Sequence, residues 1–166
     1  MPKWEKLLHP FMRSTKRRGE WAEAAFIAKA MGQGLRVSKP CGDSDPYDFV
    51  VFNIRRAMNR VQVKSAWALA RGSAYSIGTT NHRFNRSDFD FLVVALPERD
   101  LWYVIPADAV HGIAKFRLYP EPSKVKRKKT TRNFEPYREA WRLLTGDEPG
   151  AWTRYQRFTI HAGTER

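Results

Sequence analysis

The chain has 166 residues, of which 42% are hydrophobic and 13% aromatic. This excludes general disorder and predicts a single domain over residues 1–166. Its 30 Lys and Arg residues exceed its 17 Asp and Glu residues, giving a net charge of +13. Such an excess favours a polyanionic partner, nucleic acid before an acidic membrane surface, although an ordinary basic enzyme is also consistent with it.

Cysteine content and hydropathy exclude further classes. Cys41 is the only cysteine, which excludes an intramolecular disulfide framework and a cysteine-rich zinc finger. The longest apolar run, Phe91–Leu96, is far shorter than the ~20 residues that cross a bilayer. The first ten residues lack the apolar stretch of a signal peptide. We therefore expect a soluble, cytoplasmic protein with no membrane partner.

The first predicted element is a helix over residues 16–31. Ser14 or Thr15 can cap its start, and Gly32 and Gly34 end it. Four residues recur at helical spacing and predict the face that packs against a sheet. They are Trp21, Ala24, Ala25 and Ala28.

Strand patterns follow the helix. The predicted strands cover residues 35–38, 47–53, 60–65, 74–79, 89–96, 101–105 and 115–119. A short connection predicts that the strands over 47–53 and 60–65 form a hairpin. In the second of these, the alternation puts Gln62 and Lys64 on one face and the two valines on the other.

The last part of the chain changes in composition. A helical turn over residues 108–112 precedes a basic loop over 120–132 and a C-terminal helix over 134–145. This order of elements predicts the α/β class, with a central mixed β-sheet flanked by helices. The sequence has no glycine-rich phosphate loop, which argues against nucleotide-dependent chemistry.

One set of residues has the chemistry for phosphodiester hydrolysis, which needs oxygen ligands for a divalent cation and a positive charge beside them. Asp48 opens the first hairpin strand, and Gln62 and Lys64 share a face of the second. Glu20, in the first turns of the helix, could complete the group. Each residue alone also has an ordinary interpretation, as a strand cap, a solvated strand face or an exposed ion-pair partner.

Several stretches resemble the group I intron-associated PD-(D/E)xK endonuclease family. The matching stretches are residues 18–23 (RGEWAE), 37–52 (VSKPCGDSDPYDFVVF), 60–66 (RVQVKSA), 88–92 (DFDFL), 102–106 (WYVIP) and 137–144 (YREAWRLL). The resemblance implies a restriction-endonuclease-like core that cuts DNA with Mg²⁺, for which Mn²⁺ can substitute. It also implies a homing or intron-type role.

The same resemblance implies a catalytic site. Pro46 and Asp48 match the first half of the motif, Gln62 the second acidic position and Lys64 the lysine, while Glu20 matches the helix acid. Glu20, Asp48 and Gln62 are then the expected metal ligands. Gln62 stands where most nucleases of this superfamily carry Asp or Glu. Because an amide is neutral, we expect weaker metal binding, with Glu20 compensating in part. For Lys64 we favour an electrostatic role over that of a general base.

The expected partner is double-stranded DNA, cut by a homodimer or homotetramer. The predicted DNA-binding residues are Lys16, Arg17, Arg18, Arg83, Arg86, Lys124, Lys126, Arg127, Lys128, Lys129 and Arg132. Two alternatives stay open. One is a Holliday-junction-type resolvase, and the other is a catalytically silent nucleic-acid-binding module on the same fold.

Overall fold

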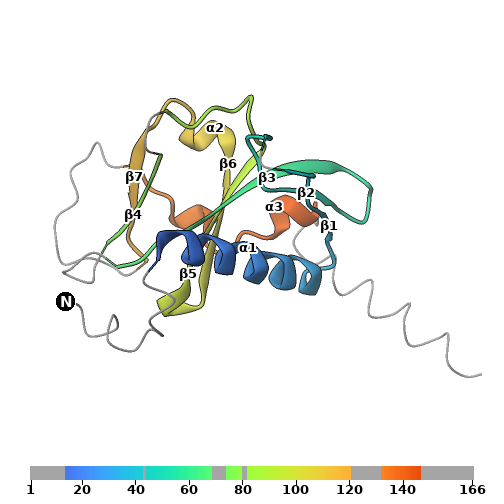
Figure 1. The fold of residues 1–166 in the computed structure, drawn as a ribbon, viewed down its shortest axis with the longest axis horizontal. Coiled ribbons are helices and arrows are strands. Elements are labelled where there is room, and N and C mark those ends of the chain that lie inside the picture. Colours follow the sequence, from blue (N-terminus) through green and yellow to red (C-terminus); the bar gives the residue numbers. More distant parts are fainter. Residues whose placement is uncertain (1–13, 43, 69–73, 80–81, 121–131, 147–166) are drawn as a thin grey trace, which may run out of the picture.

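A computed structural model describes residues 14–42, 44–68, 74–79, 82–120 and 132–146 (Figure 1). The elements in chain order are α1 (Thr15–Gly32), β1 (Arg36–Ser38), β2 (Phe49–Phe52), β3 (Met58–Ser65), β4 (Tyr75–Gly78), β5 (Phe91–Leu96), η2 (Pro97–Arg99), β6 (Leu101–Pro106), α2 (Ala107–Val110), β7 (Lys115–Leu118), η3 (Glu135–Tyr137) and α3 (Arg142–Thr145). All seven predicted strands are present, with ends that differ by two residues or fewer. None of the helices in the described ranges has the length and apolar character to cross a membrane.

Five strands form one mixed sheet in the order β1-β2-β3-β5-β6, and β4 and β7 form a separate pair. The predicted hairpin is confirmed, because β2 and β3 are antiparallel with Phe49 opposite Val61. Strands β3 and β5 are parallel, with Gln62 opposite Leu92. The mixed sheet predicted from the order of elements is therefore confirmed.

Each face of this sheet carries its own hydrophobic core. Helix α1 covers one face, and the β4–β7 pair packs on the other (Figure 1). The residues that α1 buries against its face of the sheet are Ala22, Phe26 and Ala30. The residues that β4 and β7 bury on the opposite side are Tyr75, Ile77, Phe116 and Leu118.

The predicted packing face of α1 is wrong. Trp21 is 39% exposed and Ala24 is exposed, whereas the buried stripe passes through Phe26. The ring centroid of Phe26 lies 5.2 Å from that of Phe49 and 6.3 Å from that of Trp141. The small alanines one turn before and after Phe26 let the helix approach the sheet closely, so burial of Phe26 sets the rotation of the helix.

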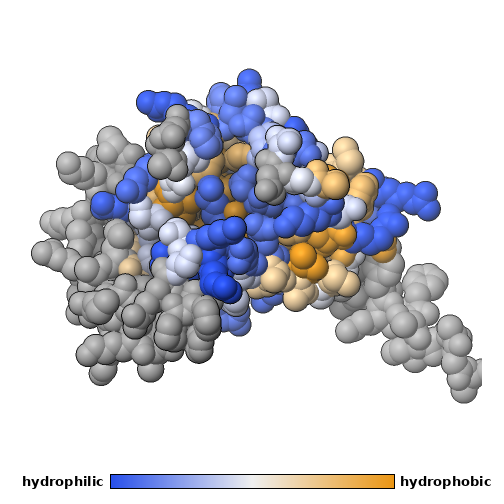
Figure 2. All heavy atoms as spheres, in the orientation of Figure 1, coloured by the Kyte–Doolittle hydropathy of each residue, from blue (hydrophilic) through white to orange (hydrophobic). Residues whose placement is uncertain are grey.

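The face of the molecule that carries α1 is mainly hydrophilic, and hydrophobic side chains gather toward its right-hand side (Figure 2). The exposed large hydrophobic residues of the described chain are Trp21, Met31, Ile54 and Met58. Single exposed apolar residues of this kind are normal on a protein surface and require no partner to explain them.

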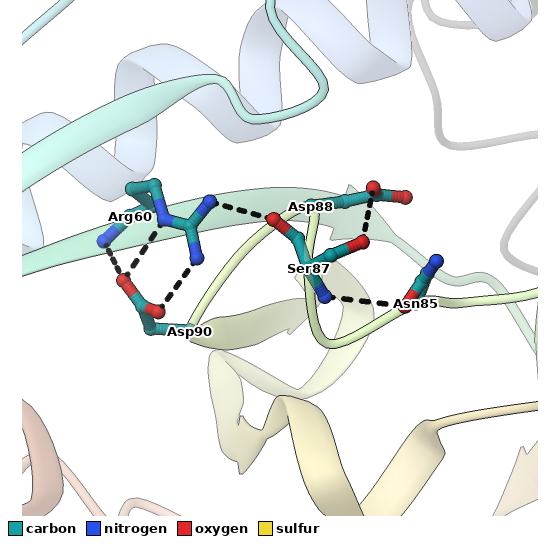
Figure 3. Close-up of polar contacts among 5 residues, drawn as sticks. All are labelled: Arg60, Asn85, Ser87, Asp88 and Asp90. Carbon is teal, nitrogen blue, oxygen red and sulfur yellow. Dashed lines mark hydrogen bonds and ion pairs between the residues drawn. The ribbon is translucent and has the colours of Figure 1, made fainter.

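A charged pair joins the start of β3 to the start of β5 (Figure 3). The Arg60 backbone N–H donates to Asp90 Oδ2 at 2.7 Å, and Arg60 Nη2 lies 3.0 Å from Asp90 Oδ1. The same guanidinium donates to the Ser87 carbonyl oxygen at 2.7 Å. Because Arg60 lies two residues before Gln62, these contacts help to fix the register that positions the rest of β3.

The continuous helix predicted over residues 134–145 is wrong. Between η3 and α3, Glu139 has a φ of 45°, which interrupts the helix. Its N–H donates to the Trp102 carbonyl oxygen at 2.8 Å, and its carboxylate accepts from the Trp102 N–H and from Trp141 Nε1–H, at 2.6 and 2.9 Å. These bonds tie the segment to the edge strand β6 and outweigh its helical propensity. The predicted basic loop over 120–132 lies almost wholly outside the described residues, and the single domain stays a prediction.

Candidate active site

The β2–β3 hairpin brings Asp48 and Gln62 into contact. Asp48 immediately precedes β2, and its N–H donates to the Val61 carbonyl oxygen at 2.9 Å. Its Oδ2 atom accepts from Gln62 Nε2 and from the Val63 N–H, both at 2.7 Å. Asp48 and Gln62, which are fourteen positions apart in the chain, are therefore joined by a hydrogen bond. The sequence pattern predicts this proximity.

The backbone explains why this carboxylate lies where it does. Residue pairing between β2 and β3 stops at Phe49 and Val61, so β2 offers no backbone acceptor for the Val63 N–H. A buried N–H needs an acceptor, and the side chain of Asp48 supplies it. The hydrogen bond holds Asp48 beside β3 without help from a ligand.

Lys64 lies on the same face of β3 as Gln62, because side chains of a strand alternate. It is partly buried and forms no salt bridge with any described residue. Its positive charge acts to lower the pKa of the Asp48 carboxyl, which opposes the effect of burial. Asp48, Gln62 and Lys64 thus form one polar group at the end of the hairpin.

Sequence reasoning missed a second carboxylate. Glu23 of α1 is partly buried, and its Oε2 atom lies 2.8 Å from Nζ of Lys39. The Lys39 ammonium is 5.7 Å from the ring centroid of Phe49, the residue after Asp48. Glu23 acts to raise the pKa of Asp48 and Lys39 acts to lower it, so both charges lie within electrostatic reach of the site.

Glu20 lies elsewhere on α1. It is exposed and makes no hydrogen bond or salt bridge with the described residues. Its role as a metal ligand stays a prediction from the sequence. One signal could have identified Glu23: it precedes Phe26 by three residues, which places it beside the buried stripe of the helix.

The pKa of Asp48 is raised above its ordinary value of 3.8. Burial is the main cause, because a low-dielectric environment disfavours the charged form. The hydrogen bond from Val63 opposes the shift, the charge of Glu23 adds to it, and the charges of Lys64 and Lys39 oppose it. The carboxylate is therefore a site that a bound cation would stabilise.

This shift predicts how stability depends on pH. Because the folded pKa of Asp48 exceeds the unfolded one, its stabilising contribution is complete below the unfolded pKa and is lost as pH rises through the folded pKa. Asp48→Asn keeps an acceptor for the Val63 N–H and removes the titration. In thermal unfolding from about pH 4 to about pH 7, we expect the variant to gain stability relative to wild type. A difference that does not change with pH would contradict the assignment.

Three residues offer oxygen ligands suited to a hard divalent cation: the carboxylates of Asp48 and Glu23 and the amide of Gln62. Gln62 presents its nitrogen to Asp48, and a half-turn of the amide would present its oxygen instead. Among the described residues, no three His, Cys, Asp or Glu side chains form a group that could hold a metal. A donor set of two acids and one neutral amide would supply little negative charge to a cation.

The predicted DNA-binding residues fall into three groups. Lys16, Arg17 and Arg18 lie on the first turns of α1, and Arg18 Cζ is 5.5 Å from the ring centroid of Trp67, three residues after Lys64. Arg18 therefore lies near the segment that follows the strand carrying Lys64.

Three other predicted residues lie around α2. Arg83 Nη1 donates to the Gly112 carbonyl oxygen at 2.7 Å, Arg86 Nη1 lies 3.5 Å from Asp108 Oδ1, and Arg132 Nη1 donates to the Ala109 carbonyl oxygen at 2.8 Å. The remaining predicted residues, Lys124, Lys126, Arg127, Lys128 and Lys129, lie outside the described residues.

Comparison with known proteins gives independent information about the family of this chain. The profile of a family described as PD-(D/E)XK endonuclease matches residues 13–143. A solved bacterial homing endonuclease, I-Ssp6803I, is 32% identical, with 86% of this chain and 98% of that chain covered and a TM-score of 0.67. The Holliday junction resolvase Hjc of Archaeoglobus fulgidus is 15% identical, with 58% and 83% covered and a TM-score of 0.40. Comparison with curated proteins gives no match. The profile and the first structure confirm the predicted restriction-endonuclease-like core.

Proposed function

Because the chain belongs to the PD-(D/E)XK endonuclease family, we propose that it cuts double-stranded DNA in a metal-dependent, homing or intron-type reaction. The observation that carries this proposal is the contact of Asp48 with Gln62, with Lys64 on the same face of β3. The homing role is supported by the 32% identity to I-Ssp6803I across 98% of that chain.

Each residue then has a role that follows from its chemistry. Asp48, the amide oxygen of Gln62 and a carboxylate of α1 would hold Mg²⁺, or Mn²⁺ in its place. A bound divalent cation supplies activation of water and compensation of phosphate charge. Lys64 would stabilise negative charge on the phosphate electrostatically, because it places a positive charge on the same face of β3 as Gln62.

Cutting both strands of a duplex favours an assembly with two such sites. A symmetric dimer or tetramer supplies them in the arrangement that matches the two strands, and we propose that the active form is a homodimer or homotetramer. Sedimentation of the protein with and without duplex DNA measures this directly.

The direct test is cleavage of supercoiled plasmid during a titration with Mg²⁺. Nicked and linear products that appear only with the cation support the proposal. A silent binding module would retard the plasmid in a gel and leave it intact. A resolvase would cut a four-way junction in preference to a linear duplex, so both substrates belong in the experiment.

A pair of variants tests which α1 carboxylate serves the site. We expect Glu23→Gln to lower cleavage and Mg²⁺ affinity by at least about tenfold, because Glu23 acts on Asp48 and is partly buried. Glu20→Gln removes the same charge from an exposed position and should change either quantity little. Calorimetry of Mg²⁺ binding and single-turnover cleavage measure the two effects. If Glu20→Gln lowered cleavage and Mg²⁺ affinity more than Glu23→Gln does, Glu20 would be the metal ligand from α1.

A further inference from the structure

The outer face of the β4–β7 pair carries two cations that sequence reasoning did not single out. Tyr75 and Ile77 of β4 and Phe116 and Leu118 of β7 point into the core. By strand alternation, the opposite face presents Ser76 and Gly78 of β4 beside Lys115 and Arg117 of β7. Lys115 and Arg117 are exposed, and within the described chain neither side chain forms a salt bridge.

Small residues lie opposite both cations. Gly78 pairs with Lys115, and Ser76 pairs with Arg117. A Cβ atom at Gly78 would lie 3.0 Å from the Ala114 carbonyl oxygen and 3.2 Å from Lys115 Cγ, so the side chain of Lys115 lies against the place that a larger residue would fill. No bulky neighbour on β4 therefore separates the two charges from an approaching ligand.

The cationic face continues into a groove with a volume of about 440 Å³. Three cations line it, Lys115, Arg117 and Arg132, together with aromatic residues that include Phe116 and Phe134. None of the described residues that line the groove is acidic. Arg132 is held in place because its guanidinium donates to the Ala109 carbonyl oxygen.

We propose that this face, the ribbon face, binds the phosphate backbone of duplex DNA outside the cleavage site. The inference rests on the proposed function, which makes duplex DNA the substrate. Lys115 and Arg117 are two residues apart on one strand, about 6.8 Å. Consecutive phosphates of one DNA strand are separated by the rise along the axis and by the rotation around it, so two long cationic side chains at this spacing can contact neighbouring phosphates of one strand.

The chain path connects the ribbon face to the site. An isolated β-bridge pairs Ala68 with Tyr75, so β4 starts beside the segment that leaves β3 just after Lys64. By strand alternation, Gln62 and Lys64 point to the side of the sheet on which the β4–β7 pair packs. The ribbon face is the outer side of that pair, so bound DNA must extend beyond the pair to reach them. The ribbon face positions DNA, and it carries no sequence information by itself.

The test compares two double variants of the full-length protein that lose the same charge. Lys115→Ala with Arg117→Ala removes the ribbon cations, and Lys29→Ala with Arg142→Ala removes two cations outside the ribbon face. Binding of a short labelled duplex without divalent cations is followed by fluorescence anisotropy across a salt series. Removing two phosphate contacts should reduce the log–log salt slope by about 1.8 and weaken binding about 60-fold at ~0.1 M salt. The control pair should leave the slope close to that of wild type.

Other outcomes separate this inference from the proposed function. Equal changes in slope for both double variants, or no change for the ribbon variant, would overturn the ribbon face while plasmid cleavage by wild type still supports the nuclease. If wild type binds DNA and the ribbon double variant shows the reduced salt slope, but wild type does not cut plasmid, the ribbon face is supported and the nuclease function is overturned. Absence of DNA binding by wild type would overturn both. If the alanine variant unfolds, Lys115→Gln with Arg117→Gln replaces it, with the fold checked by thermal unfolding.

Discussion

Asp48→Ala is expected to reduce the rate of DNA cleavage by at least about three powers of ten, or ~4 kcal/mol of barrier. The substitution removes the carboxylate that Gln62 and Val63 both contact, and with it the only carboxylate that the hairpin provides to the site. DNA affinity should persist, because phosphate contacts come from cations elsewhere on the surface. Single-turnover cleavage and anisotropy measured on the same preparation separate the two quantities.

Lys64→Ala is expected to give a loss of similar size for a different reason. It removes the positive charge beside Asp48 and leaves the carboxylate in place. Lys29→Ala is a matched control, since it removes a lysine from α1 at the far end from Arg18. Undiminished cleavage by both Asp48→Ala and Lys64→Ala would remove the active-site assignment.

Phe26→Ala is expected to destabilise the protein by about 3–5 kcal/mol, because it empties a fully buried ring position. The lost ring packs on Phe49, and Phe49 follows Asp48 directly in the chain. The cavity therefore lies behind the site as well as inside the core. Chemical denaturation, with the midpoint and slope fitted together, measures the change in the free energy of unfolding.

Trp21→Ala is the control for this prediction. The sequence pattern placed Trp21 on the packing face, whereas the structure leaves it 39% exposed. We expect its replacement to cost clearly less than that of Phe26, despite the larger side chain. A larger loss in the free energy of unfolding for Trp21→Ala than for Phe26→Ala would support the packing face predicted from the sequence.

The sequence was sufficient for the elements whose signals are local. Alternation in β3 predicted that Gln62 and Lys64 share a face, and the hairpin spacing predicted that Asp48 lies beside Gln62. These predictions succeed because a strand has only two faces and a short hairpin has few registers. The net charge of the chain pointed to nucleic acid as the favoured partner before any fold was known.

Features that depend on distant contacts could not be read in this way. Helical spacing alone predicted the wrong packing face for α1, because burial of Phe26 sets the rotation of the helix. That rotation also decides whether Glu20 or Glu23 lies closer to the sheet. The break at Glu139 depends on Trp102, which lies 37 residues earlier in the chain. The pairing of β4 with β7 joins segments that are far apart in the chain. The basic face that it creates could therefore not be predicted from the sequence of either strand alone.

The bond between Arg60 and Asp90 has a practical meaning for anyone who grafts this cutting unit into another scaffold. The pair lies outside the reacting groups, and it helps to fix the position of β3 along the parallel strand β5. A shift of one residue would turn Gln62 and Lys64 toward the helix. A transplanted hairpin without Asp90 would keep Asp48 and Gln62 in contact and lose one of the contacts that hold β3 against its parallel neighbour.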